Sequence, residues 1–172
     1  GSVVLIAVGA TFVIISGGID LSVGSTIALS GVVSAWFMVN VLDLSQASSG
    51  AQVYWALLAG LVVSVMMGLI VGAVNAAMIN LAKIPPFIAT LATLGAGSGF
   101  AVIISDGMPI GGPNDFALIS AFDQSTNPFS WAVLTVAVVV VFLGLILHKS
   151  RFGLYTYAIG SNVFAARAAG IN

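Results

Sequence analysis

The chain has 172 residues, of which 60% are hydrophobic and only 5% are charged, and its formal net charge is -1. A soluble domain carries about 25% charged residues, so this composition excludes a water-exposed globular surface and indicates a protein embedded in the lipid bilayer. With no cysteine and one histidine, the chain offers no thiolate or imidazole metal cluster. We therefore expect no metal and no cofactor, and the near-zero charge argues against nucleic acid as a partner.

Five apolar stretches are expected to form helices that cross the bilayer. The hydrocarbon core of a bilayer needs about 20 residues of helix, and in lipid the helix pairs its own backbone groups. The stretches run, in chain order, over residues 3–15, 23–42, 53–82, 88–105 and 131–147. The pattern predicts an all-α, polytopic transmembrane helical bundle with about five membrane crossings, forming a single domain over residues 1–172.

The sequence SGGIDLSVGS, at 16–25, separates the first apolar stretch from the second, and it contains paired glycines and the first charge of the chain. Gly17 and Gly18 are expected to end the first helix, and Asp20 and Ser22 are both good N-caps for the second. One interpretation is a capped turn near the cytoplasmic face. The other is a helix break inside the bundle with Asp20 lining a polar path, because ionisable groups in membranes often mark pathways. All four residues are candidates for a substrate path or gate.

Small residues recur at every fourth position of the third stretch. The members of this stripe are Gly60, Ser64, Gly68 and Gly72. Such a stripe lets another helix approach closely. We favour helix packing over a role in lining the substrate path.

The basic residues predict the orientation of the chain in the membrane. Alternating the helix directions places Lys83, Lys149, Arg151 and Arg167 on one side, whereas the loop 106–130 holds no basic residue. Cytoplasmic loops carry an excess of Lys and Arg. The segment 149–172 is therefore predicted to be cytoplasmic and the loop 106–130 to be periplasmic.

The segment after the fifth stretch is predicted to hold a short helix over 163–169. Ser161 or Asn162 would cap its start and Gly170 would end it. This helix is too short to cross a membrane. It would lie at the interface or fit a groove on a partner, and from the residues alone we favour the interface.

Three motifs together resemble one known family. SGGIDLSVGS (16–25), PFIATLATL (86–94) and RFGLYTYAIGSNVFAARAAGIN (151–172) are similar to the membrane permease of ribose-type ATP-binding-cassette sugar importers. The resemblance implies a permease of the bacterial inner membrane that forms the translocation path for a ribose-like monosaccharide. It also implies a non-catalytic subunit that works with ATPase subunits, a periplasmic sugar-binding protein and a second permease copy. Permeases of this family have roughly twice this length, so the C-terminal half is expected to be missing.

The resemblance also assigns residues to the cytoplasmic segment. It implies that 149–172 contains a coupling helix that sits in a cleft on the ATPase. The positions matching the family pattern are Gly160, Asn162, Ala165, Arg167, Gly170 and Ile171. An acidic residue commonly follows the asparagine in this family, whereas this chain has Val163, which removes an ion pair there.

A competing hypothesis is an ion-coupled secondary transporter with broken helices. Such a transporter needs charged groups near the middle of the membrane, and only Asp20 comes near, since the chain has no glutamate. No G-x-x-x-x-G-K-[ST] motif occurs in the chain, so it does not bind ATP by that route. A permease driven by a separate ATPase is therefore the preferred prediction.

Overall fold

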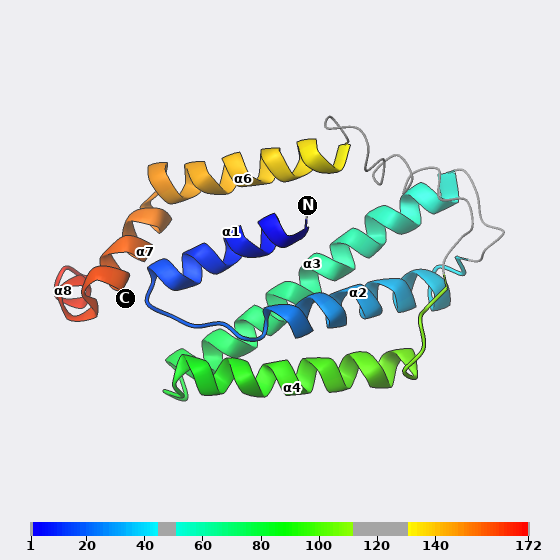
Figure 1. Ribbon diagram of the computed structural model, residues 1–172, viewed down its shortest axis with the longest axis horizontal. Helices are drawn as coiled ribbons and strands as arrows, with labels where there is room; N and C mark the ends of the chain where they lie inside the picture. The colour runs from blue at the N-terminus through cyan, green and yellow to red at the C-terminus, as the bar shows by residue number, and fades with distance from the viewer. Residues whose placement is uncertain (1, 45–50, 112–130, 172) are drawn as a thin grey trace. The chain divides into compact units, whose positions relative to one another are not determined.

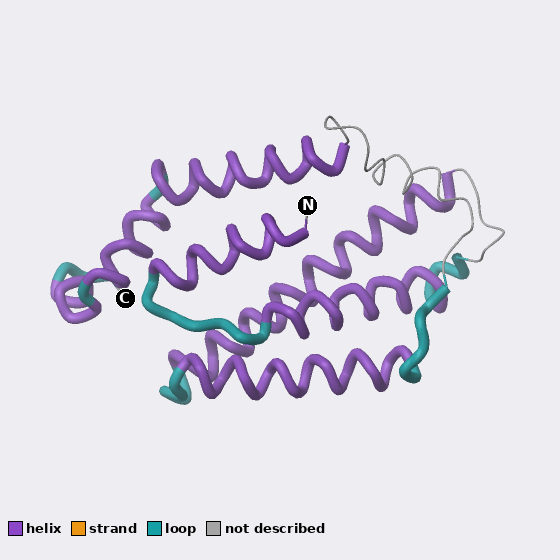
Figure 2. Tube along the Cα trace, viewed as in Figure 1, coloured by secondary structure: helices purple, strands orange, loops and turns teal. Residues whose placement is uncertain are grey.

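The computed structural model describes residues 2–44, 51–111 and 131–171 of the chain. The described elements are helices joined by loops, with no strand among them (Figures 1 and 2). The all-α prediction is confirmed. The described residues divide into two compact units, one of residues 20–111 and the other of residues 2–19 and 131–171.

The first unit described here contains α2 (Val23–Asn40), α3 (Ala51–Asn80) and α4 (Pro86–Ser105), and we call it the α2–α4 unit. Helix α2 packs against both α3 and α4, which contact each other less extensively (Figure 1). The starts of α2 and α4 lie at the same end of the unit as the end of α3. We call this the Lys83 end, because the short connection between α3 and α4 contains Lys83.

Helices α2 and α3 approach closely at Gly60. The Oγ of Ser34 donates a hydrogen bond of 2.8 Å to the carbonyl oxygen of Gly60. A Cβ at Gly60 would lie 2.9 Å from Ser34 Oγ and 2.7 Å from the sulfur of Met38. By contrast, a Cβ at Gly68 or Gly72 would meet nothing within 4 Å.

The predicted packing stripe therefore shows one helix contact, at Gly60, within the described part of the chain. The next member, Ser64, is half-buried. A packing role for Ser64, Gly68 and Gly72 stays a prediction.

The side chains of the α2–α4 unit are distributed in the reverse of a soluble protein. Ser22 is 1% exposed and Thr90 is 2% exposed, whereas Leu69 is 62% exposed and Ile103 is 70% exposed. In water this arrangement would leave a large apolar surface solvated, but against lipid tails exposed leucine costs nothing. The distribution fits helices that face the bilayer on the outside and pair their polar groups within.

The second unit contains α1 (Ser2–Ile15), α6 (Trp131–Lys149), α7 (Arg151–Ser161) and α8 (Val163–Ala168), and we call it the α1/α6–α8 unit. Helices α6 and α7 meet at an angle of 68°. Ser150 makes the bend, with an extended backbone (φ -104°, ψ 160°). Its Oγ accepts a hydrogen bond from the Gly153 amide at 3.2 Å and donates one to the Ile146 carbonyl oxygen at 2.6 Å.

Helix α1 packs against α6 and α7 within the same unit. The rings of Phe12 and Phe152 lie 6.0 Å apart, centroid to centroid. At the end of α1, Gly17 has φ +80°, and the amides of Gly17 and Gly18 bond to the carbonyls of Ile14 and Val13 at 3.0 and 2.9 Å. This closure confirms that the glycines end the first helix.

Three described helices, α2, α3 and α4, are long and apolar enough to cross a membrane, or four spans if the bent pair α6 and α7 counts as one. Helix α1 is apolar but shorter, and together these helices fit the predicted polytopic transmembrane fold. The bounds of α3 lie two residues earlier than predicted, and α2 ends at Asn40 rather than at 42. Most of the predicted periplasmic loop, residues 112–130, lies outside the described residues.

Candidate functional site

The stretch between α1 and α2 does not form the predicted cap. Ser22 occupies the N-cap position of α2, but its side chain makes no capping hydrogen bond. Instead, the Oδ1 atom of Asp20 accepts hydrogen bonds from the Ser22 amide at 2.8 Å and from Ser22 Oγ at 2.6 Å. The two predicted caps therefore bond to each other, because the serine hydroxyl is drawn into contacts with α3.

These contacts form a chain of polar side chains that crosses the α2–α4 unit. The Nδ2 of Asn75 on α3 donates to Ser22 Oγ at 2.9 Å. The Oγ1 of Thr93 on α4 donates to Asn75 Oδ1 at 2.9 Å. We call Asp20, Ser22, Asn75 and Thr93 the polar relay. It joins the turn before α2 to both neighbouring helices.

Ser25 adds a second link between α2 and α4 beside the polar relay. Its Oγ donates to the Ser22 carbonyl oxygen at 2.9 Å and makes a longer contact of 3.3 Å with the Thr93 carbonyl oxygen. A Cβ at Gly97 would lie 3.1 Å from Ser25 Oγ, so the glycine allows α4 to approach the serine. Gly97 sits in the small-residue sequence GAGSG at 95–99.

Sequence reasoning singled out Asp20 and Ser22 but missed Asn75, Thr93 and Ser25. An isolated amide in the apolar 30-residue helix α3 was an available signal, because an unpaired amide in lipid costs several kcal/mol. That signal does not name the partner. Asn80, on the same helix, bonds only its own helix through the Ala76 carbonyl and is exposed.

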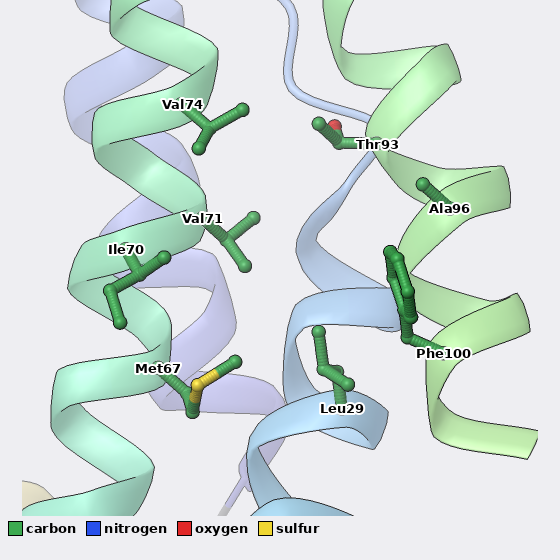
Figure 3. Close-up of a pocket in the computed structure, with 9 residues that line it drawn as sticks. Leu29, Met67, Ile70, Val71, Val74, Thr93, Ala96 and Phe100 are labelled. Carbon is green, nitrogen blue, oxygen red and sulfur yellow. The ribbon is translucent and has the colours of Figure 1, made fainter. Parts of the chain in front are cut away.

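A cavity of about 230 Å³ lies between α2, α3 and α4 (Figure 3). Its walls are formed by Leu29, Met67, Ile70, Val71, Val74, Thr93, Ala96, Gly97 and Phe100. The single hydroxyl, that of Thr93, belongs to the polar relay. A site for a polar ligand needs convergent polar groups, and this cavity does not supply them. The polar relay is therefore the better candidate for a functional site in this unit.

The predicted short helix is present as α8, and Asn162 rather than Ser161 caps it. The Oδ1 of Asn162 accepts a hydrogen bond from the Ala165 amide at 3.0 Å. Ser161 is instead the last residue of α7. At the other end, Gly170 has φ +81°, and the amides of Gly170 and Ile171 both bond back to α8 at 3.0 Å. Gly170 therefore ends the helix as predicted.

The other two residues of the predicted coupling set, Gly160 and Arg167, do not form the ends of α8. The position of a Cβ at Gly160 is occupied by the carbonyl oxygen of Ile15 at the end of α1. Gly160 thus allows α7 and α1 to approach closely. Arg167 is exposed on the last turn of α8. Among the six residues, Arg167 alone offers a long charged side chain for an external contact.

The structure divides the predicted substrate-path residues between its units. Gly17 and Gly18 belong to the α1/α6–α8 unit, whereas Asp20 and Ser22 belong to the α2–α4 unit. The coupling set lies wholly in the α1/α6–α8 unit. No group of three or more metal-ligating side chains occurs among the residues that the structure describes.

Comparison with known proteins finds transport permeases that match nearly the whole chain. The family model described as "Branched-chain amino acid transport system / permease component" matches residues 1–172. The ribose import permease protein of Bacillus subtilis is 38% identical over 168 residues, which cover 97% of this chain and 48% of that protein. The D-allose transport system permease protein of Escherichia coli is 32% identical, covering 98% of this chain and 48% of its own length.

A third relative is named for a different substrate. The autoinducer 2 import system permease protein of an Enterobacter species is 34% identical, covering 98% of this chain and 49% of that protein. No solved structure matches the chain. The chain spans about half the length of the curated relatives it matches. The protein belongs to the transport-system permease family that this model describes, and the resemblance to permeases of ribose-type ATP-binding-cassette importers is confirmed.

Proposed function

We propose that the protein is the permease subunit of an importer in the bacterial inner membrane that carries a ribose-like monosaccharide. ATP is hydrolysed by separate ATPase subunits, and the permease itself is non-catalytic. A periplasmic sugar-binding protein delivers the substrate, and a second permease copy, identical or related, completes the path. The observation that carries this proposal is the match to ribose and allose import permeases over nearly the whole chain.

The polar relay supports a role for Asp20 in the path. Asn75 lies five residues before the end of α3, and Thr93 lies seven residues into α4. At about 1.5 Å per residue, these side chains sit roughly 8 to 10 Å inside the helix ends. The interfacial layer on each side of a bilayer is about 6 Å thick, so these depths support a position for Asn75 and Thr93 within the hydrocarbon region of a spanning α4. A carboxylate held there is a natural acceptor for sugar hydroxyl groups.

The geometry of α8 supports a role in docking to the ATPase. Asn162 and Gly170 define both ends of a compact helix that projects beyond α7, and Arg167 is exposed on it. The basic residues at this end of the chain favour a cytoplasmic position for α8, on the side where the ATPase subunits of the proposed importer work. A short rigid helix can transmit a displacement of its partner, whereas a flexible tail cannot.

The full-length permease, reconstituted in vesicles with its cognate ATPase and binding protein, is expected to take up the sugar only when ATP is supplied. The measurement is accumulation of radiolabelled ribose inside the vesicles with and without ATP. A non-hydrolysable ATP analogue serves as the control. Uptake driven by a proton or sodium gradient without ATPase would contradict this proposal and support the ion-coupled alternative.

Arg167→Glu is expected to weaken ATPase recruitment by at least about tenfold, because a reversed charge in a docking contact meets repulsion as well as lost attraction. Binding of purified ATPase to the full-length permease in detergent measures the effect. Lys149→Glu, at the end of α6, is the matched control for a change of charge on the same side of the membrane. Equal binding by wild type and the Arg167 variant would exclude this residue from the contact.

A further inference from the structure

Asn75 is a buried amide in a membrane-spanning helix. It is 7% exposed, on a helix whose most apolar window has a mean hydropathy of 2.6. Taking such an amide out of water without partners is costly, so its hydrogen bonds constrain where it can lie. Among the described residues of α3 it is the only buried polar side chain.

The side-chain amide of Asn75 donates one hydrogen bond and accepts another. Its Nδ2 atom donates to Ser22 Oγ, and its Oδ1 atom accepts from Thr93 Oγ1, each at 2.9 Å. The hydroxyl of Ser22 has a single hydrogen. Because Nδ2 approaches a lone pair of Ser22 Oγ, that hydrogen is directed to Asp20, where the contact is 2.6 Å.

These hydrogen bonds determine how the carboxylate of Asp20 is oriented. Its Oδ1 atom receives both the hydroxyl and the amide hydrogen of Ser22. Its other oxygen, Oδ2, accepts neither of these bonds. The orientation of Asp20 is therefore set by Ser22, and the rotamer of Ser22 is set by Asn75. Thr93 Oγ1 donates to Asn75 Oδ1 at 2.9 Å and also lies 3.0 Å from the Thr90 carbonyl oxygen, so it favours the orientation of the Asn75 amide that donates to Ser22.

We infer that Asn75 is a positioning residue, which fixes the Asp20 carboxylate through Ser22 so that Oδ2 is presented as an acceptor for a hydroxyl-bearing substrate. The presentation of Oδ2 to substrate rests on the proposed function, whereas the dependence of the carboxylate on Asn75 rests only on the hydrogen bonds. A purely structural role would make Asn75 hold α3 against α2 and α4 without affecting the carboxylate.

The test is an infrared measurement on the full-length permease with isotope-labelled aspartate. Isotope labelling restricts the signal to aspartate carboxylates, and the 172 residues contain five of them. Comparison of wild type with Asp20→Asn identifies the Asp20 band. In Asn75→Leu, which keeps the approximate volume and suits an apolar helix, the Asp20 band is expected to shift. Asn80→Leu, which removes an exposed amide from the same helix, is expected to leave it unchanged.

A second variant keeps the test decisive should Asn75→Leu fold poorly. Thr93→Val preserves shape and removes only the hydroxyl that bonds Asn75 Oδ1, and it is expected to shift the same band by a smaller amount. In a Ser22→Ala background, Asn75→Leu is expected to produce no further shift, since the connection to Asp20 is already broken. An Asp20 band that stays in place in both Asn75→Leu and Thr93→Val would overturn the inference.

Uptake by the same variants separates this inference from the proposed function. Asn75→Leu is expected to lower ATP-driven sugar uptake about tenfold, as expected for loss of a hydrogen bond that orients a charged group. If the band shifts and wild type takes up no sugar with ATP, the proposed function fails while the positioning role of Asn75 stands. If wild type transports and the band does not shift, only the positioning role fails.

Discussion

Gly160→Ala is expected to lower the free energy of unfolding of the full-length permease by about 3 kcal/mol or more, near the upper end of the cost of overpacking. The added methyl group would overlap the carbonyl oxygen of Ile15 and would lie 2.8 Å from the carbonyl carbon of that residue. The obstructing atoms are backbone atoms. They cannot rotate aside as a side chain could.

The end of α1 is also held by its own hydrogen bonds, which makes relaxation expensive. The amides of Gly17 and Gly18 close the last turn onto Ile14 and Val13. Moving Ile15 away from α7 would disturb this closure or separate the two helices. The expected loss can be measured by unfolding the purified permease in mixed micelles of increasing denaturing detergent.

Gly144→Ala is the matched control for Gly160→Ala. Gly144 lies on α6 in the same unit, and a Cβ there would meet nothing within 4 Å. Alanine is a better helix former than glycine, so this variant should be as stable as wild type or slightly more stable. Equal stability of the two variants would show that α1 and α7 do not make this contact. Loss of ATPase binding by a fully stable Gly160→Ala protein would instead assign Gly160 to docking.

Asp20→Ala is expected to abolish ATP-driven uptake and to destabilise the permease. The change leaves both the amide and the hydroxyl of Ser22 without their acceptor. Each buried donor left unsatisfied costs about 1–3 kcal/mol. Ser22, at 1% exposed, has no access to solvent that would replace the lost bonds.

Asp20→Asn separates the structural effect from the effect of the charge. The amide keeps an acceptor oxygen for Ser22, so the variant should unfold close to wild type. Uptake should still fall by about tenfold, because a neutral amide is a weaker acceptor for substrate hydroxyls than a carboxylate. Uptake at the wild-type rate by Asp20→Asn would contradict a role for the charge in the path and leave Asp20 as a structural residue of the turn.

The fold class and several helix ends were predictable because they depend on local sequence. An apolar run of about 20 residues has one stable conformation in lipid, since only a helix pairs its own backbone there. Gly17 and Gly170 both adopt positive φ at helix ends, a conformation that glycine reaches at little cost. These features need no partner element.

Local patterns failed where the outcome depended on competing contacts. Asp20 and Ser22 have the right chemistry for caps, yet Ser22 bonds Asn75 instead of the first turn of α2. Helix α7 was not predicted at all, because two of its 11 residues are glycines, which disfavour a helix. Its start depends on Ser150, whose extended backbone and Oγ bonds produce the bend after α6.

By itself, the sequence determined a membrane-embedded, all-helical chain and several of its helix ends, because hydropathy and glycine conformation act over a few residues each. Only the tertiary structure decided that Asn75 meets Ser22, 53 positions away, and that Gly160 meets the end of α1. Such contacts follow from which helix faces oppose each other. A polar or small residue in an apolar helix indicates that the helix has a partner at that position. Which residue is the partner depends on how the surrounding helices pack.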